Sequence, residues 1–239
     1  MNENLQDSEL YEARFGVKER RSNTRFYVVL FLIVMAFLIF RAYWTSNFGI
    51  VAVDGTSMNR TLADGEYLLS RNVKDAEDLK RGDIIVVYVK NIPEFQKDNK
   101  IAEADPDDDI YPTYYLIKRL IALEGDIVRC IKGELEICYA GTWNKEMGYE
   151  NYPFVKVDEP YAYYTNKNAP QCTFEYEVKE GEVFFLGDNR NGSKDSRYEQ
   201  DGFSRLDRLY KAEYITATVP EWAVENKGLY QWICKLLYP

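Results

Sequence analysis

The sequence predicts an all-β domain of curved antiparallel sheets that follows one N-terminal transmembrane helix. Two observations lead to this fold class. Residues 26–40 contain no charged side chain, and apolar runs of this kind are typical of membrane-spanning helices. After them come short segments rich in Val, Ile, Tyr and Phe, separated by Gly-Asp or Asp-Gly pairs. This second pattern is typical of antiparallel strands joined by tight turns.

The apolar stretch is expected to be an uncleaved signal anchor over residues 26–44. Residues 26–40 alone would make about 22 Å of helix, less than a hydrocarbon core of roughly 30 Å. The span must therefore continue through Arg41 to Tyr43 and Trp44, which suit the membrane interface. A buried core helix is disfavoured because every face is apolar. A cleaved leader is disfavoured because an arginine and aromatic residues stand where small cleavage-site residues belong.

Charges beside the span predict its orientation. Four basic residues precede it closely against one acidic residue, whereas Arg41, which directly follows residues 26–40, is the sole basic residue at its other end; the four are Lys18, Arg20, Arg21 and Arg25. Basic flanks stay on the cytoplasmic side of a membrane. Residues 1–25 are therefore expected in the cytoplasm, and residues 45–239 as an extracytoplasmic domain at the cell membrane.

The part after the anchor contains several candidate strands. In chain order they are IVAVDG (50–55), EYLLS (66–70), DIIVVYVK (83–90), YYLIKRLIAL (114–123), DIVRCI (126–131), LEICYA (135–140) and EVFFLGDN (182–189). Helical spacing returns only at residues 221–237. Residues 91–113, with EADPDDDIYP at their centre, are expected to form an exposed acidic insertion loop between two strands. A calcium loop is the alternative, and it is disfavoured because the spacing of the aspartates is not that of an EF-hand.

The cysteines allow two interpretations. A hairpin turn near residues 133–135 would place Cys130 opposite Cys138, and the extracytoplasmic compartment permits a disulfide there. Two buried cysteines that never pair remain the alternative. A zinc site is not expected, because the chain has neither a CxxC motif nor a histidine. The net charge of −9 argues against a nucleic-acid partner, because a protein that binds nucleic acid needs a basic surface. The protein is expected to be a monomer.

The absence of histidine restricts the chemistry. It excludes Ser-His-Asp and Cys-His arrangements and HExxH zinc sites. A hydroxyl nucleophile then needs a neutral lysine, a lone carboxylate or a processed N-terminal amine as its base. Ser57, in GTSMNRTL (55–62), is far from the N-terminus. A lysine in apolar surroundings is therefore the base to look for.

Lys118 is such a lysine. It lies in YYLIKRLIAL, where strand alternation puts it on one face with Leu116 and Leu120. Loss of hydration on an apolar face lowers the pKa of an amine toward the range in which it accepts a proton at neutral pH. A lysine that reaches solvent at a strand edge is the ordinary alternative, so this residue alone does not decide the function.

Four sequence blocks together resemble the bacterial type I signal peptidases, or leader peptidases, of the Ser-Lys class. The blocks are SMNRTL (57–62), RGDIIVV (81–87), KRLIALEGD (118–126) and GDNRNGSKDSR (187–197), in this order after one membrane anchor. The resemblance runs from the anchor to about Tyr210. It implies a membrane-bound serine endopeptidase that acts on signal peptides of exported preproteins at the lipid bilayer.

The resemblance also implies residue roles. Ser57 is expected to be the nucleophile, with its N–H facing the oxyanion, and Lys118 the general base. Ser193 is expected to hydrogen-bond the lysine amine, and Asp195 and Arg197 to form an ion pair that supports the site. No metal or organic cofactor is expected.

Three positions depart from the family pattern. Arg60 and Glu124 stand where the family usually has proline, which affects turn rigidity and not proton transfer. Gly55 replaces a hydroxyl residue that gives some members a second oxyanion donor. A catalytically inactive, membrane-tethered homologue that acts as a binding module therefore remains the alternative. The preferred preproteins and the role of residues 91–113 stay open.

Overall fold

The structure is a computed structural model that describes residues 23–89, 114–164, 173–193, 195–197, 211–228 and 231–232. The predicted cytoplasmic segment up to residue 22 and the insertion 91–113 lie outside these ranges. The chain divides into two compact units, Met1–Ser46 and Asn47–Pro239.

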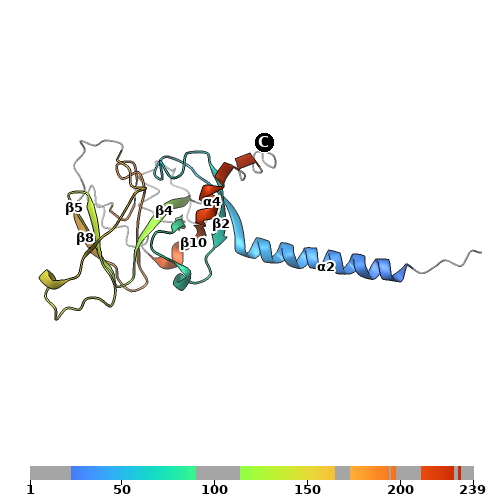
Figure 1. Cartoon of the computed structure of the whole chain (residues 1–239), viewed down its shortest axis with the longest axis horizontal. Coiled ribbons are helices and arrows are strands. Elements are labelled where there is room, and N and C mark those ends of the chain that lie inside the picture. The colour runs from blue at the N-terminus through green and yellow to red at the C-terminus, as the bar shows by residue number, and fades with distance from the viewer. Residues whose placement is uncertain are drawn as a thin grey trace, which may run out of the picture. The chain divides into compact units, whose positions relative to one another are not determined.

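The first unit contains nearly all of α2, a continuous helix over Thr24–Asn47 (Figure 1). It starts two residues before and ends three residues after the predicted span 26–44. Its 24 residues make about 36 Å of helix, and its most apolar window has a mean hydropathy of 2.4. The helix is therefore long and apolar enough to cross a bilayer, without further extension beyond its own ends.

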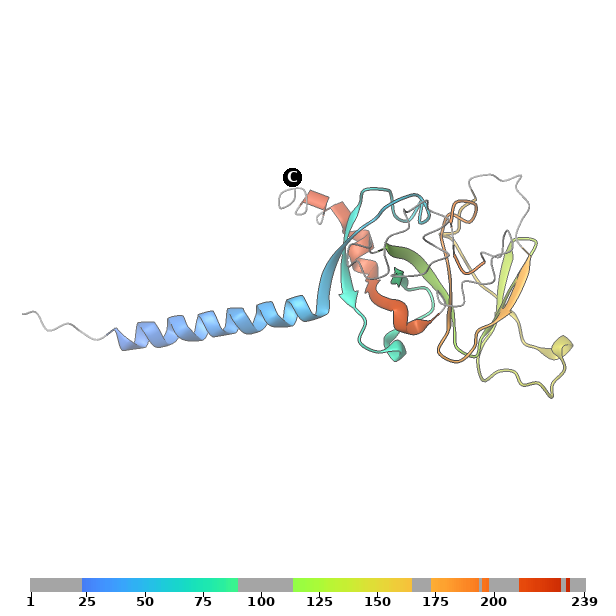
Figure 2. The same cartoon turned by 180° about the vertical axis from the view of Figure 1, so that it is seen from behind.

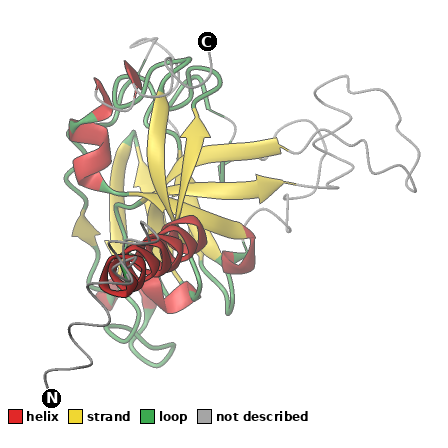
Figure 3. Cartoon of the chain, turned by 90° about the vertical axis from the view of Figure 1, so that its right-hand side faces the viewer, coloured by secondary structure: helices red, strands yellow, loops and turns green. Residues whose placement is uncertain are grey.

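The second unit is built from two antiparallel sheets, which Figure 2 shows from behind and Figure 3 shows in yellow. The larger sheet has the order β1-β2-β10-β3-β4-β9. In chain order its strands are β1 (Phe48–Ala52), β2 (Tyr67–Asn72), β3 (Ile84–Val89), β4 (Tyr114–Leu123), β9 (Val183–Leu186) and β10 (Ile215–Val219). All of its pairings are antiparallel, so the predicted fold class is confirmed.

The smaller sheet has the order β7-β6-β5-β8. Its strands are β5 (Ile127–Ile131), β6 (Glu134–Cys138), β7 (Val155–Lys156) and β8 (Phe174–Glu177). Four short helices lie outside the sheets: η1 (Ala76–Asp78), η2 (Tyr149–Asn151), η3 (Ala212–Tyr214) and α4 (Glu221–Glu225). Residues 227–228 and 231–232 are also helical. The sequence prediction missed β7, β8 and β10, although it found the other strands.

The larger sheet buries both of its faces. In β3, Ile84 and Val86 belong to one apolar cluster, which also contains Ala223 of α4. The alternate residues Ile85 and Val87 belong to a second cluster. Side chains alternate between the faces of a strand, so a charged residue on either face of this region of the sheet loses much of its hydration. This environment matters for Lys118, which pairs with Ile85 in the sheet.

Of the two interpretations of Cys130 and Cys138, the structure has the unpaired one. The β5–β6 turn consists of Lys132 and Gly133, whose φ angles are 51° and 86°. Positive φ at both central residues is typical of a two-residue type I′ hairpin turn. This turn begins one residue earlier than predicted and sets Cys130 opposite Leu135. Both thiols are buried and neither forms a disulfide. The other two cysteines lie outside the described residues.

Candidate active site

Ser57 lies in the turn that follows β1. Its neighbours Met58 and Leu62 are buried at 1% and 0% exposure, and the Leu62 N–H donates to the Met58 carbonyl at 2.8 Å. Asn189 holds the turn from the other side. Its main-chain N–H donates to the Ser57 carbonyl at 3.0 Å, and its side-chain amide donates to the Thr56 carbonyl at 3.0 Å. The serine backbone is therefore fixed between a packed core and a second loop.

Lys118 of β4 reaches this serine. Its Nζ lies 2.9 Å from Ser57 Oγ and 2.9 Å from the carbonyl oxygen of Ile117. The residue is 3% exposed. Burial lowers the pKa of Lys118 from 10.5 to about 8, although the charges of Asp195 and Asp188 act in the opposite direction. A large share of the amine is therefore neutral in mildly alkaline solution.

This geometry can activate the serine. In its neutral form the amine can donate to the Ile117 carbonyl and accept the Ser57 hydroxyl proton through its lone pair. The hydroxyl oxygen then becomes a nucleophile. A cavity of about 350 Å³ opens beside both residues and is also lined by residues 52–56, Met58, Tyr115, Leu116, Ile117 and Gly192. A peptide carbonyl thus has room to approach Ser57.

The expected hydrogen bond between Ser193 and Lys118 is not formed. Ser193 Oγ is buried and has no hydrogen-bond partner among the described residues, while the amine is engaged by Ser57 and Ile117. The hydroxyl nevertheless lies close to the site. A Cβ atom added to Gly187 would be 2.2 Å from Ser193 Oγ and 2.6 Å from the Ser57 carbonyl oxygen. Because Gly187 has no side chain, Ser193 and the main chain of Ser57 can both pack against it.

Asp195 and Arg197 form the expected ion pair. Arg197 donates from Nε and Nη2 to the two carboxylate oxygens of Asp195, each at 2.8 Å. Asp195 Oδ2 also accepts the Gly187 N–H at 2.9 Å, and its side chain is 1% exposed. The pair therefore ties the end of block 187–197 to its beginning and keeps a negative charge near Lys118.

A second buried ion pair was missed by the sequence analysis. Arg119 donates from Nε and Nη2 to Asp188 at 2.8 and 2.7 Å, and the Asp188 side chain is fully buried. Arg119 directly follows Lys118, and Asp188 directly follows Gly187. Arg119 lies in block 118–126 and Asp188 lies in block 187–197, and these positions were the signal that could have pointed to the two residues. Sequence alone does not pair side chains that are 69 residues apart.

A metal site is not indicated. The described residues contain no group of three or more Cys, Asp or Glu side chains arranged to hold a metal ion. The buried carboxylates of Asp188 and Asp195 are paired with arginines.

Comparison with known proteins identifies the family. Residues 24–216 match the family described as signal peptidase, peptidase S26. The chain belongs to this family. Signal peptidase I of Bacillus licheniformis is 33% identical over 76% of both chains, and signal peptidase I U of Bacillus subtilis (strain 168) is 32% identical over 75% of this chain and 80% of that protein. A solved structure of a signal peptidase I from Enterococcus faecalis V583 is 23% identical to this chain, with a TM-score of 0.35. The alignment covers 59% of this chain and 97% of that protein's chain.

The departures from the signal peptidase pattern have contacts of their own. The Glu124 carboxylate accepts the N–H of Gly181 at 2.8 Å. The guanidinium of Arg60 lies 4.1 Å from the centre of the Tyr163 ring, which is within range of a cation–π interaction. The Gly55 N–H donates to Asp64 at 2.8 Å. Where proline would stiffen a turn through its ring, Arg60 and Glu124 each restrain their loop through a side-chain contact.

Proposed function

We propose that this signal peptidase family member is a membrane-tethered serine endopeptidase that removes N-terminal signal peptides from exported preproteins, with Ser57 as nucleophile and Lys118 as general base. The observation that supports the pair most strongly is the 2.9 Å contact between Lys118 Nζ and Ser57 Oγ. The burial of the lysine adds the second requirement, because an amine acts as a base only when it has lost its proton.

The proposed reaction has two halves. Neutral Lys118 takes the Ser57 hydroxyl proton while the oxygen attacks the carbonyl carbon before the cleavage point. The lysine then gives the proton to the leaving amine, and an acyl ester remains on Ser57. In the second half the lysine takes a proton from water while the water oxygen attacks the ester. The lysine then returns this proton to the departing Ser57 oxygen, which releases the carboxylic acid product and restores the enzyme. The Ser57 main-chain N–H is the proposed oxyanion donor, and one such donor contributes about 3 to 4 kcal/mol.

Asp195, Arg197 and Ser193 are proposed as supporting residues. Asp195 and Arg197 hold block 187–197 closed through the Gly187 N–H. Ser193 is the proposed acceptor of a hydrogen bond from the lysine amine once Ser57 is acylated and no longer occupies that amine. Ser193 Oγ is available for this bond, because it has no other hydrogen bond among the described residues.

The membrane anchor is part of the proposal. The helix Thr24–Asn47 is proposed to span the cell membrane with the N-terminus in the cytoplasm, since the basic cluster from Lys18 to Arg25 precedes it. From Trp44 to Ser57 an extended chain reaches at most about 43 to 47 Å, which keeps the nucleophile near the outer membrane surface. We expect a membrane-impermeant thiol label to reach a cysteine engineered within residues 91–113 on intact cells; labelling of that site only after lysis would reverse the orientation.

The alternative function is that of an inactive, membrane-tethered binding module. The two functions differ in one assay. We expect the full chain in detergent micelles to shorten an exported preprotein by its signal peptide, as seen by mass spectrometry of the product. Ser57→Ala should leave the preprotein intact, whereas the same substitution at the exposed Ser46 should not change the rate. An intact preprotein with the folded wild-type chain would favour the binding module.

A further inference from the structure

Residues 159–163 contact three arginines that belong to three different sequence blocks of the site. Glu159 binds Arg190 of block 187–197. The Tyr161 ring centre lies 3.9 Å from the guanidinium of Arg119, in the lysine block, and the Tyr163 ring centre lies 4.1 Å from that of Arg60, in the serine block. We propose that this segment, the clasp, positions the Ser57–Lys118 pair by holding the three blocks against one another. The inference rests on the proposed function.

The contact of Glu159 with Arg190 is the most buried of the three. Arg190 Nη1 donates to Glu159 Oε2 at 3.0 Å, and Arg190 Nη2 donates to Glu159 Oε1. The two side chains are only 1% and 9% exposed. A charge removed from water in this way is stable only while its partner stays in place. If the Glu159 carboxylate is lost, the Arg190 guanidinium is therefore expected to move or to become hydrated.

Arg190 connects the clasp to the lysine. Its Nε donates to the Gly187 carbonyl at 3.2 Å, and its own carbonyl accepts from Arg197 Nη2 at 2.9 Å. Arg197 in turn holds Asp195, which binds the Gly187 N–H and is one of the two carboxylates whose charge acts on Lys118. A displaced Arg190 thus disturbs both ends of block 187–197, although Arg190 itself does not line the cavity beside Ser57.

The main chain of the clasp makes the same connection. The Tyr163 N–H donates to the Asp188 carbonyl at 2.7 Å, and the Arg190 N–H donates to the Tyr163 carbonyl at 2.7 Å. These bonds flank Asn189, whose N–H fixes the Ser57 carbonyl. The main chain of the clasp is therefore connected to the Ser57 carbonyl through Asn189.

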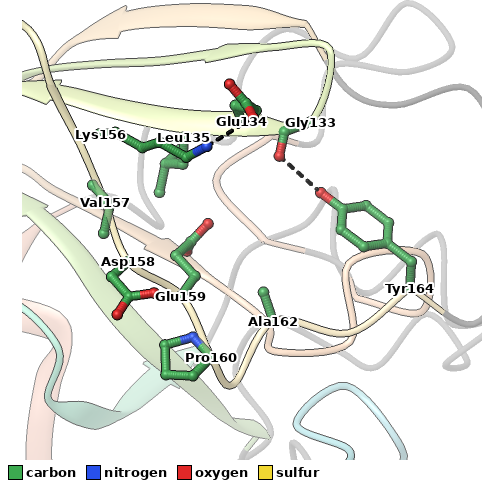
Figure 4. A pocket seen from close by; sticks show the side chains of 10 residues that line it. All are labelled: Gly133, Glu134, Leu135, Lys156, Val157, Asp158, Glu159, Pro160, Ala162 and Tyr164. Atoms are coloured by element: carbon green, nitrogen blue, oxygen red, sulfur yellow. Dashed lines mark hydrogen bonds and ion pairs between the residues drawn. The ribbon is translucent and has the colours of Figure 1, made fainter.

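A second pocket supplies a matched control for this idea. Its volume is about 550 Å³, and its wall includes Glu159, Tyr164 and the exposed ion pair of Glu134 with Lys156 (Figure 4). Glu134 makes its ion pair at 2.7 Å with both side chains 63% exposed. Glu134→Gln is thus the same chemical change on the same pocket, without a contact to the catalytic blocks among its described bonds.

The test compares Glu159→Gln with Glu134→Gln in the full chain, using cleavage of a signal-peptide substrate. We expect Glu159→Gln to lower kcat about tenfold or more with KM nearly unchanged, because the reacting groups are misplaced, whereas Glu159 itself does not line the cavity beside Ser57. Glu134→Gln should stay within about twofold of wild type. Equal rates for the two variants, in a wild-type chain that cleaves, would overturn the clasp but leave the proposed function standing. A wild-type chain that does not cleave would overturn both.

Two further comparisons separate positioning from stability. In a double-mutant cycle, adding Glu159→Gln to Arg190→Gln should cost no additional activity, because the glutamate acts through that arginine; fully additive losses would contradict this. If Glu159→Gln does not fold, the ring contact at Tyr163 serves instead. Tyr163→Phe keeps the aromatic face over Arg60 and should retain kcat, whereas Tyr163→Leu should reduce it. Equal kcat values in these two folded variants would refute the clasp.

Discussion

Replacing Lys118 by arginine is expected to abolish peptide-bond cleavage, with a loss of at least about 10³-fold in kcat/KM. The reason is that arginine keeps its proton at any workable pH and therefore offers no lone pair to the Ser57 hydroxyl. The positive charge beside Asp195 and Asp188 is retained, so a loss of charge cannot account for the result. The measurement is the rate of release of a signal peptide by the full chain at constant detergent.

The control for this variant is Lys156→Arg, the same substitution at an exposed ion pair, which should cleave at nearly the wild-type rate. Circular dichroism shows whether Lys118→Arg is folded. Should the larger guanidinium not fit a site that is 3% exposed, Lys118→Met removes the amine and keeps a side chain of similar length. Substantial cleavage by either folded variant would mean that another group is the base.

Gly187→Ala is expected to reduce kcat/KM by about 10²-fold or more, although it adds only one methyl group. The new Cβ would lie 2.2 Å from Ser193 Oγ, 2.4 Å from Ser193 Cβ and 2.6 Å from the Ser57 carbonyl oxygen. These separations are far below van der Waals contact, and two of the three atoms cannot rotate away. Either the nucleophile turn or the Ser193 loop must move, and both movements change the geometry around Lys118.

Gly228→Ala is the matched control, because a Cβ there meets nothing within 4 Å. It should leave both activity and the thermal midpoint nearly unchanged. Full activity in a folded Gly187→Ala variant would show that the packing of Gly187 against Ser57 and Ser193 is not required for catalysis. Reduced activity in both glycine variants would indicate a general loss of stability and not a local displacement.

The sequence predicts most strands because the alternation of apolar and polar residues along a strand is visible without knowledge of the fold. It predicts β3 and β4 closely, whereas the two-residue strand β7, Val155 and Lys156, which pairs with β6, leaves almost no pattern to detect. The missed strand β10 does alternate, with Ile215, Ala217 and Val219 buried. Its Thr and Ala residues are weaker signals than the Val and Ile of β3, because short or polar side chains contribute less to the apolar period.

The site was predictable to the extent that chemistry restricts residue types. Without histidine, a buried lysine was the candidate base for Ser57, and the resemblance placed that candidate at Lys118. The contacts of the clasp were not predictable, because Glu159 and Arg190 are joined only by the fold. The Ser193 hydrogen bond was expected from the resemblance, but the structure engages the lysine amine with the Ile117 carbonyl instead.

The pH dependence of kcat/KM tests the central claim, that neutral Lys118 is the base for Ser57, most directly. Burial lowers the pKa of Lys118 to about 8. Below that pH the amine is protonated and inactive, and above it the amine is neutral. The rate should therefore rise about tenfold per pH unit on the acidic side and level off above about pH 8. The chain has no histidine to produce such a limb, and unperturbed carboxylates titrate near pH 4. A profile that is flat from about pH 5 to 10 in the folded enzyme would contradict the claim.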